Sequence, residues 1–123
     1  MAWVVEFYQE APGRRAPVEE FLAELPMKHK AKALGIVKRL EEVGMNLPFP
    51  YSSKVRGRIR ELRTQQGKDK IRILYFADAR RWFILLHGIV KRASKLDEQD
   101  IRTAERRMNL HNAWLRNRKG DNP

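Results

Sequence analysis

The stretch that decides the fold spans residues 54–95 and reads KVRGRIRELRTQQGKDKIRILYFADARRWFILLHGIVKRASK. It contains three short apolar runs: an arginine-rich run at 59–62, and two runs rich in β-branched and aromatic residues at 71–76 and 82–90. Turn-like clusters at 65–68 and 78–80 separate the runs. Runs and breaks of these lengths are typical of an antiparallel meander. The stretch therefore predicts three consecutive strands against which the rest of the chain packs.

Before this stretch, the sequence predicts one further strand and a short helix. The strand is the β-rich run WVVEFY at 3–8, which is interrupted at Gly13 and is expected to lie at the side of the last meander strand. The helix is expected at 17–25, with Pro17 near its first position, a place that proline favours. Its apolar residues follow the i, i+3, i+4, i+7 spacing of one helix face; they are Val18, Phe21, Leu22 and Leu25.

A second helix is predicted to follow Pro26 and to end at Gly44, since glycine is favoured just beyond a helix C-terminus. Its apolar residues recur every three positions, and the expected core stripe is Leu34, Val37, Leu40 and Val43. Residues 45–53, which include two prolines, are expected to form a loop that crosses to the sheet.

A final helix is predicted after the meander, with Asp97 as a candidate cap. One side of this helix is expected to carry Ile101, Ala104, Met108, His111 and Leu115. Residues 1–116 are expected to form one domain, and 117–123 a frayed polar tail. The predicted order β-α-α-β-β-β-α defines an α+β fold, with helices packed on a small, mainly antiparallel sheet.

The composition excludes several kinds of site. The 123 residues contain no cysteine, so disulfides and thiolate metal sites are impossible. Three histidines lie far apart in the sequence and suggest no metal cage. No apolar segment approaches the roughly 18–20 residues that cross a membrane, and the N-terminus lacks the basic region of a signal peptide. We therefore expect a cytoplasmic protein without a metal or cofactor.

The charge balance points to a negatively charged partner. With 26 basic and 15 acidic residues, the formal net charge is +11. Such an excess favours nucleic acid, an anionic membrane or an acidic protein as the partner. The alternative interpretation is a solvated basic surface of the kind found on many thermophilic proteins.

Four short sequence motifs in the meander region occur in the same order as in a known protein family. They are RELR at 60–63, RILYF at 72–76, LLHG at 85–88 leading to KR at 91–92, and KL at 95–96. With these words the chain resembles the phage-derived, Gp49-like (HigB-type) branch of the RelE/ParE/HigB toxin superfamily. Sequence motifs carry the resemblance over residues 55–108. In the rest of the chain, only the order of helices and strands agrees with the family. It implies a RelE-like fold.

The resemblance also implies a function: the toxin of a bacterial type II toxin–antitoxin pair. Characterised relatives cleave mRNA in the ribosomal decoding site, and their partner in this branch is often an antitoxin with a helix-turn-helix domain. The expected activity is thus a metal-independent, ribosome-dependent mRNA endonuclease, with a cognate antitoxin, the ribosome and mRNA as partners. Two alternatives stay open: a non-enzymatic toxin that binds another target such as DNA gyrase, and an inactive, basic nucleic-acid-binding relative.

The sequence departs from the family pattern in places. Arg60 stands where relatives often have an aromatic residue, Ile89 replaces phenylalanine, Arg92 replaces lysine and Asp97 replaces proline. Glu61 lies on a strand where ribosome-dependent relatives carry basic residues. These departures affect the expected catalytic set more than the expected fold.

Metal-free RNA cleavage uses the 2′-hydroxyl of the RNA as nucleophile, and needs a proton acceptor, a proton donor and cations around the phosphate. Arginine suits the last role because it stays protonated and binds phosphate through two donors. Histidine titrates near neutral pH. The candidate catalytic residues are Arg63, Arg72, Tyr75, His87, Lys91 and Arg92. The candidate RNA-binding residues are Lys54, Arg56, Arg58, Arg60 and Lys95.

Structural roles compete with these assignments. Tyr75 alternates with apolar strand residues and His87 follows two of them, so both could be core residues. Arg72 could instead form a salt bridge with Glu61 across the strand pair. His29 and His111 are expected on helix surfaces or at an interface. The pair Trp82 and Phe83 is expected to pack under the last and second helices.

Overall fold

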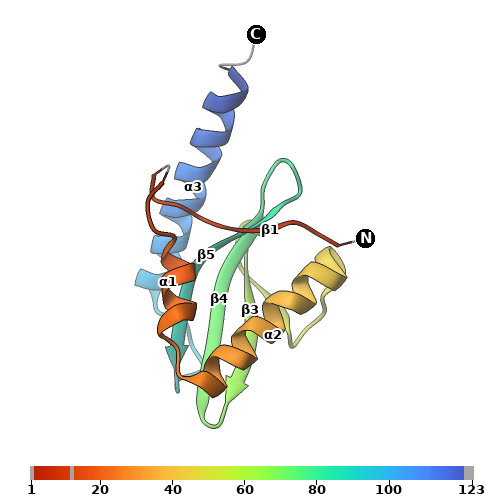
Figure 1. The fold of residues 1–123 in the computed structure, drawn as a ribbon, viewed down its shortest axis with the longest axis vertical. Coiled ribbons are helices and arrows are strands. Elements are labelled where there is room, and N and C mark those ends of the chain that lie inside the picture. Colours follow the sequence, from red (N-terminus) through yellow and green to blue (C-terminus); the bar gives the residue numbers. More distant parts are fainter. Residues whose placement is uncertain (1, 12, 121–123) are drawn as a thin grey trace.

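The predicted meander forms the centre of a five-stranded sheet (Figure 1). The structure, a computed structural model, describes residues 2–11 and 13–120. The meander strands are β3 (Ile59–Gln66), β4 (Asp69–Ala77) and β5 (Phe83–Lys91), and they pair antiparallel in sequence order. The first strand, β1 (Val5–Phe7), pairs parallel with β5, which confirms its expected place. It is shorter than predicted, although the Tyr8 amide still donates to the Leu85 carbonyl.

A fifth strand, β2 (Ser52–Arg56), corrects the predicted order. It pairs antiparallel with β3 at the sheet edge, so the order is β-α-α-β-β-β-β-α, with a 3₁₀ turn (Gly44–Asn46) after the second helix. No apolar run marks this strand in the sequence, because Val55 is its one apolar residue. The hairpin depends on a turn at Gly57, whose φ is +56°, a value that glycine adopts without strain.

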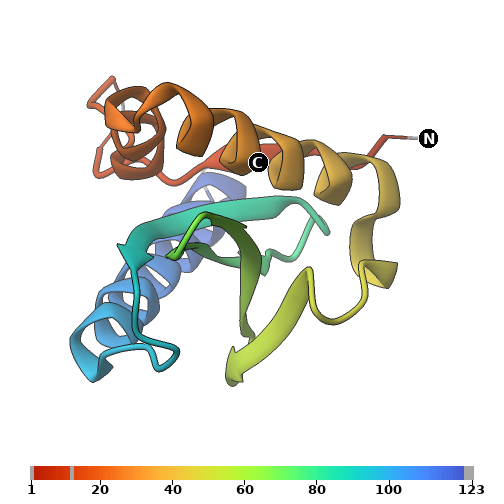
Figure 2. The ribbon, with the colours of Figure 1, turned by 90° about the horizontal axis from the view of Figure 1, so that it is seen from below.

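The first two helices cover one face of the sheet, and the third lies on the other face (Figure 2). Helix α1 (Pro17–Glu24) confirms the first predicted helix, with Val18 and Leu22 buried. Helix α2 (Met27–Val43) has Gly44 as its C-cap, as predicted. Gly44 has φ +67°, and the Trp3 ring occupies the space that a Cβ would fill.

The predicted core stripe of α2 was wrong in part. Its buried residues are Ala33, Ile36 and Leu40, whereas Leu34 is 49% exposed. A stripe that recurs every three residues drifts around a helix of 3.6 residues per turn. Leu34 is therefore carried away from the sheet, although Leu40 stays in the core.

Helix α3 (Glu98–Gly120) buries the predicted side, including Ile101, Ala104 and Leu115. It continues four residues beyond residue 116, into the predicted tail; residues 121–123 lie outside the described part. His111 corrects the expectation of a surface histidine, because it is buried and its Nε2 lies 3.0 Å from Oδ2 of the buried Asp78. This contact ties α3 to the β4–β5 connection.

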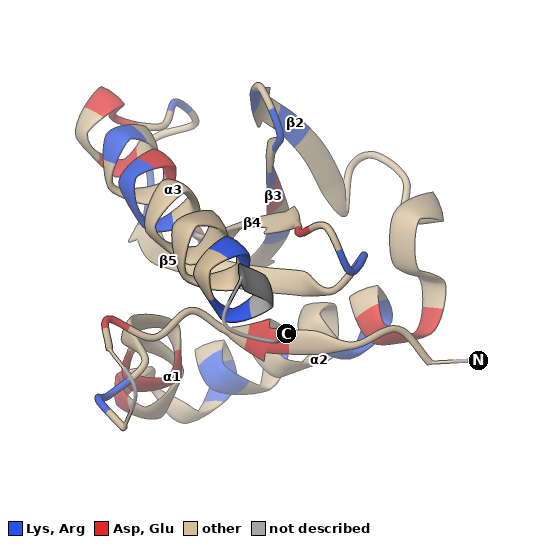
Figure 3. Cartoon of the chain, turned by 90° about the horizontal axis from the view of Figure 1, so that it is seen from above, with Lys and Arg blue, Asp and Glu red and all other residues tan. Residues whose placement is uncertain are grey.

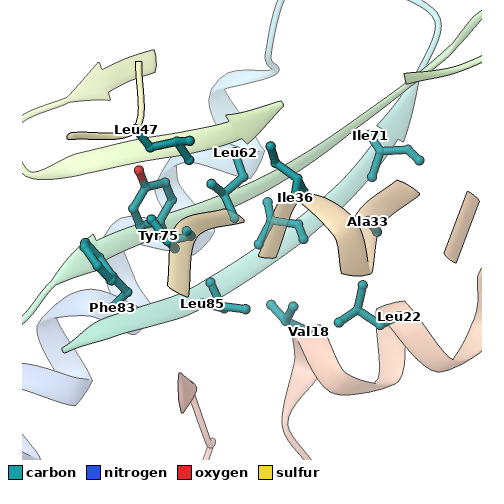
Figure 4. Packing of buried hydrophobic residues seen from close by; sticks show 12 residues of the cluster. Val18, Leu22, Ala33, Ile36, Leu47, Leu62, Ile71, Tyr75, Phe83 and Leu85 are labelled. Atoms are coloured by element: carbon teal, nitrogen blue, oxygen red, sulfur yellow. The ribbon is translucent and has the colours of Figure 1, made fainter. Parts of the chain in front are cut away.

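Two apolar cores lie on opposite faces of the sheet. The larger core packs α1 and α2 on residues such as Leu62 and Leu85 (Figure 4). The smaller core packs α3 on residues such as Leu74 and Leu86. As predicted for the aromatic pair, Phe83 belongs to the core under α2 and Trp82 packs against the core under α3.

None of the helices in the described ranges is long and apolar enough to cross a membrane.

Candidate functional site

Four cations gather on the face of the sheet that carries α3. The β3–β4 register sets Arg63 directly opposite Arg72, and the β4–β5 register sets Lys70 opposite Lys91. Side chains alternate between the two faces along a strand, so these four share one face. Like charges directly opposite each other destabilise a sheet. The arrangement is therefore suited to hold an anion between them.

Three of these cations border an open cleft. The cleft has a volume of about 260 Å³ and is lined by Pro50, Tyr51, Arg63, Thr64, Gln65, Lys70 and Arg72. Helix α3 packs on β5 and β4, while β2 and β3 curl toward the side of α3 (Figure 2). Lys and Arg residues mark β2, β3 and α3 around this side (Figure 3). This part of β3 thus stays accessible to a ligand.

The segment between β5 and α3 holds the cations in place. Arg72 is 4% exposed, and its Nη2 donates to the carbonyl of Ser94. Nζ of Lys70 donates to the Ser94 hydroxyl at 2.7 Å, and Nζ of Lys91 lies 2.8 Å from Oδ2 of Asp97. Arg72 is therefore fixed by its neighbours, and a ligand would meet a guanidinium that is already oriented.

Glu61 lies on the same face of the sheet and brings a carboxyl group to this cluster. Its Oε1 lies 3.2 Å from Nε of Arg63, so the predicted structural alternative, an ion pair between Glu61 and Arg72, is replaced by a pair with Arg63. Burial raises the pKa of the Glu61 carboxyl, although Arg72 and Arg63 act in the opposite direction. A buried carboxyl with a raised pKa beside two arginines is a candidate proton acceptor.

Two members of this cluster, Glu61 and Lys70, are not among the candidates predicted from the sequence. The acidic charge of Glu61 argues against a place among RNA-binding cations. The available signal was the strand period of two, which places Glu61 with Arg63 and Lys70 with Arg72 on one face. No sequence pattern predicts that the Glu61 carboxyl is buried, and it is this burial that raises its pKa.

Both ring nitrogens of His87 have partners in helix α3. Nη1 of Arg107 lies 3.3 Å from Nδ1, and Oδ1 of Asp100 lies 2.8 Å from Nε2. A guanidinium can only donate hydrogen bonds, so Nδ1 of His87 is the acceptor. The ring proton then lies on Nε2, which donates a hydrogen bond to Oδ1 of Asp100. His87 thus matches the structural alternative, a histidine whose two ring nitrogens are both hydrogen-bonded within the protein. Neither ring nitrogen is left for a substrate.

Tyr75 lies on the opposite face from Arg72. It is 3% exposed within the core under α1 and α2, and its hydroxyl lies 2.7 Å from Oγ of Ser52. Nε of Arg60 donates to the same oxygen at 3.0 Å. The structure therefore separates Tyr75 from the Arg63–Arg72 cluster, and matches the alternative of a core tyrosine.

Arg92 lies near the β3–β4 turn but outside the cleft. It is exposed, and its Nε donates to Oδ1 of Asp69 at 3.3 Å. Hydrogen bonds from His29 and Arg92 lower the pKa of the Asp69 carboxyl. The His29 contact, at 2.9 Å, joins α2 to the turn. Lys95 is exposed in the segment before α3, next to the site of Lys91.

The other predicted RNA-binding residues divide between the two faces. Arg56 pairs with Glu98 of α3 through two hydrogen bonds of 2.7 and 2.8 Å, which lower the pKa of Glu98 to about 2. Lys54, Arg58 and Arg60 instead line a second cleft of about 380 Å³ that also borders Tyr75. The predicted set is thus basic on both sides of the β2–β3 hairpin.

Across residues 2–11 and 13–120, no group of three or more His, Asp or Glu side chains is placed to hold a metal ion.

Comparison with known proteins gives one family. The family model described as phage-derived protein Gp49-like matches residues 20–109, a range that contains every residue of the Arg63–Arg72 cluster. This match confirms the resemblance carried by the sequence motifs of the meander. No curated protein matches the chain.

Proposed function

Because the chain belongs to the Gp49-like family of phage-derived proteins, we propose that it is the toxin of a bacterial type II toxin–antitoxin pair. Its proposed activity is metal-independent cleavage of mRNA on the ribosome, which inhibits translation in the cytoplasm. Its proposed partners are the ribosome, mRNA and a cognate antitoxin with a helix-turn-helix domain. The fold proposed for this activity is RelE-like. A small helix-turn-helix protein encoded beside this chain would support the pairing.

The observation that carries this proposal is the cross-strand pair Arg63 and Arg72 at one cleft. Two guanidinium groups that line the same cleft can bind one phosphate through several donors. They would also stabilise the extra negative charge of the phosphorane-like transition state, where one preorganised donor is worth about 2.7–4 kcal/mol. Lys70 adds a third cation to the cleft lining.

Glu61 supplies the proton acceptor in this proposal. Its raised pKa brings the carboxyl closer to the working pH, where a general base is most effective. Its neighbour Arg63 binds both the carboxylate and, in the complex, the phosphate, so base and phosphate would be held together. Lys91 and Arg92 lie beyond these groups and would contact the flanking RNA backbone.

The test is primer extension on mRNA from cells that express the protein without its antitoxin. New 5′ ends within translated regions, absent when translation initiation is blocked, are the expected result. Intact mRNA in growth-arrested cells would contradict the nuclease assignment. The same ends in cells expressing an Arg63→Ala, Arg72→Ala double variant would assign the cleavage to another nuclease.

One observation favours the non-enzymatic alternative. His87 and Tyr75, the two acid–base residues expected from the sequence, are both engaged in structural contacts. A toxin that blocks a target such as DNA gyrase needs the basic surface but no proton transfer. A supercoiling assay with purified gyrase separates the two: inhibition without mRNA cleavage would support the alternative.

A further inference from the structure

Two aromatic rings lie at the rim of the Arg63–Arg72 cleft, on the segment between α2 and β2. Phe49 is 71% exposed and Tyr51 is 38% exposed. Tyr51 lines the cleft together with Arg63 and Arg72, and the Arg63 guanidinium lies 5.2 Å from the centre of the Phe49 ring. Exposed aromatic rings beside cations are the combination by which proteins bind single-stranded nucleic acid.

Backbone hydrogen bonds and a second arginine hold Tyr51 in position. The Arg63 amide donates to the Tyr51 carbonyl at 2.8 Å, and the Tyr51 amide donates to the Pro48 carbonyl at 2.9 Å. Pro48 and Pro50 restrict the backbone around Phe49. The Arg39 guanidinium lies 4.5 Å from the centre of the Tyr51 ring. A base that stacks on Tyr51 would meet a ring that is already held, so ordering this ring would cost little conformational entropy.

We infer that Phe49 and Tyr51 form a stacking platform for an unpaired nucleobase of single-stranded RNA. The base would belong to a nucleotide next to the phosphate held by Arg63 and Arg72. The inference rests on the proposed function and adds to it the part of the ligand that the cations do not contact. Because every base has a π-face, the platform accepts all four bases.

The test uses a labelled single-stranded RNA decamer that is 2′-O-methylated throughout and so cannot be cleaved by 2′-hydroxyl attack. Dissociation constants are measured by fluorescence anisotropy for the wild type and for a Phe49→Leu, Tyr51→Leu double variant. A second decamer lacks all of its bases but keeps the sugar-phosphate backbone. Trp114→Leu is the matched control, because Trp114 is also an exposed aromatic (39%) with an arginine over its ring.

The double variant is expected to bind the complete decamer about 5- to 100-fold more weakly, the range for loss of base stacking. It should bind the base-free decamer as the wild type does, and Trp114→Leu should match the wild type on both. The slope of log affinity against log salt should stay unchanged for the double variant, since no phosphate contact is lost.

Three results would overturn the inference. The double variant could bind the complete decamer as tightly as the wild type, or lose equal affinity for both decamers. The wild type could also bind neither decamer. The proposed mRNA cleavage would still be tested independently, by primer extension on mRNA from cells. A double variant that binds RNA normally but escapes its antitoxin would identify the segment as a protein interface instead.

Discussion

At the scale of single residues, Arg72 combines a structural contact with a position for phosphate binding. It is buried, donates to the Ser94 carbonyl and lines the cleft opposite Arg63. We expect Arg72→Ala to lower the mRNA cleavage rate about 10²–10³-fold, on the scale of one lost preorganised donor. Ribosome binding should weaken much less, because many other cations share the nonspecific phosphate contacts.

Arg72→Lys separates the two roles. Lysine keeps the charge and one donor for the Ser94 carbonyl, but it lacks the planar fork of the guanidinium. We expect Arg72→Lys to have a melting temperature near that of the wild type and to recover only part of the cleavage rate. Lys28→Ala, which removes an exposed cation from α2, is the control for loss of a charge outside the cleft. A folded Arg72→Ala protein with unaltered cleavage would remove this residue from the site.

Glu61 gives a prediction that involves both rate and stability. If its carboxylate accepts the proton of the 2′-hydroxyl, Glu61→Gln should lower the cleavage rate about 10²–10⁴-fold. For the wild type, the rate should rise with pH through the raised pKa of Glu61, and this rise should be absent in the variant. The exposed Glu42→Gln is the control. A variant with the wild-type rate and pH profile would exclude Glu61 as the base.

The same raised pKa fixes the sign of the effect on stability. The folded protein holds the Glu61 proton to a higher pH than the unfolded chain does. The contribution of this residue to stability is therefore greatest at low pH and falls as pH rises from the unfolded to the folded pKa. At neutral pH the ionised carboxylate opposes folding, so Glu61→Gln should keep or raise the melting temperature. A clear fall would mean that the pair with Arg63 is needed for folding.

At the scale of elements, the contact between α1 and β5 depends on the absence of a side chain at Gly88. A Cβ at this position would overlap the Phe21 ring of α1. We expect Gly88→Ala to lower the free energy of unfolding by about 1–3 kcal/mol, as for other overpacked sites, measured by urea denaturation. Cleavage should persist in the folded fraction, because Gly88 lies on the face that packs against α1.

Gly35 provides the matched control for Gly88. It lies within α2, and a Cβ there would meet no atom within 4 Å. Alanine exceeds glycine in helix propensity by about 1 kcal/mol, so Gly35→Ala should raise the free energy of unfolding by up to that amount. Equal effects of the two substitutions would contradict the proposed packing of Phe21 on β5.

At the scale of the whole molecule, the charge of +11 and the family together predict toxicity that a partner controls. Expression without a partner should arrest bacterial growth, and co-expression of the neighbouring gene should restore it, as followed by colony counts. The Arg63→Ala, Arg72→Ala double variant should permit growth at the same expression level. Harmless high-level expression of the wild type in several hosts would contradict an active toxin.

The amino-acid pattern is enough to predict the three meander strands, the three helices and the family, but not strand β2. The β-rich runs at 71–76 and 82–90 are long and apolar enough to fix two central strands, and the spacing of Val18 and Leu22 fixes α1. The period of two along a strand is also enough to place Arg63 and Glu61 on one face. These features are local, because they depend on residues within a few positions of each other, and the family words lie within the same strands.

Which groups meet depends on how the strands and helices pack. The strand register sets Arg63 opposite Arg72, and the docking of α3 supplies Asp100 and Arg107 to both nitrogens of His87. The same packing places Tyr75 in the other core. Each contact joins residues far apart in the sequence, and burial of a carboxyl depends on every element around it. No local pattern encodes such contacts, so which of the predicted residues meet is set only when the sheet and helices are assembled.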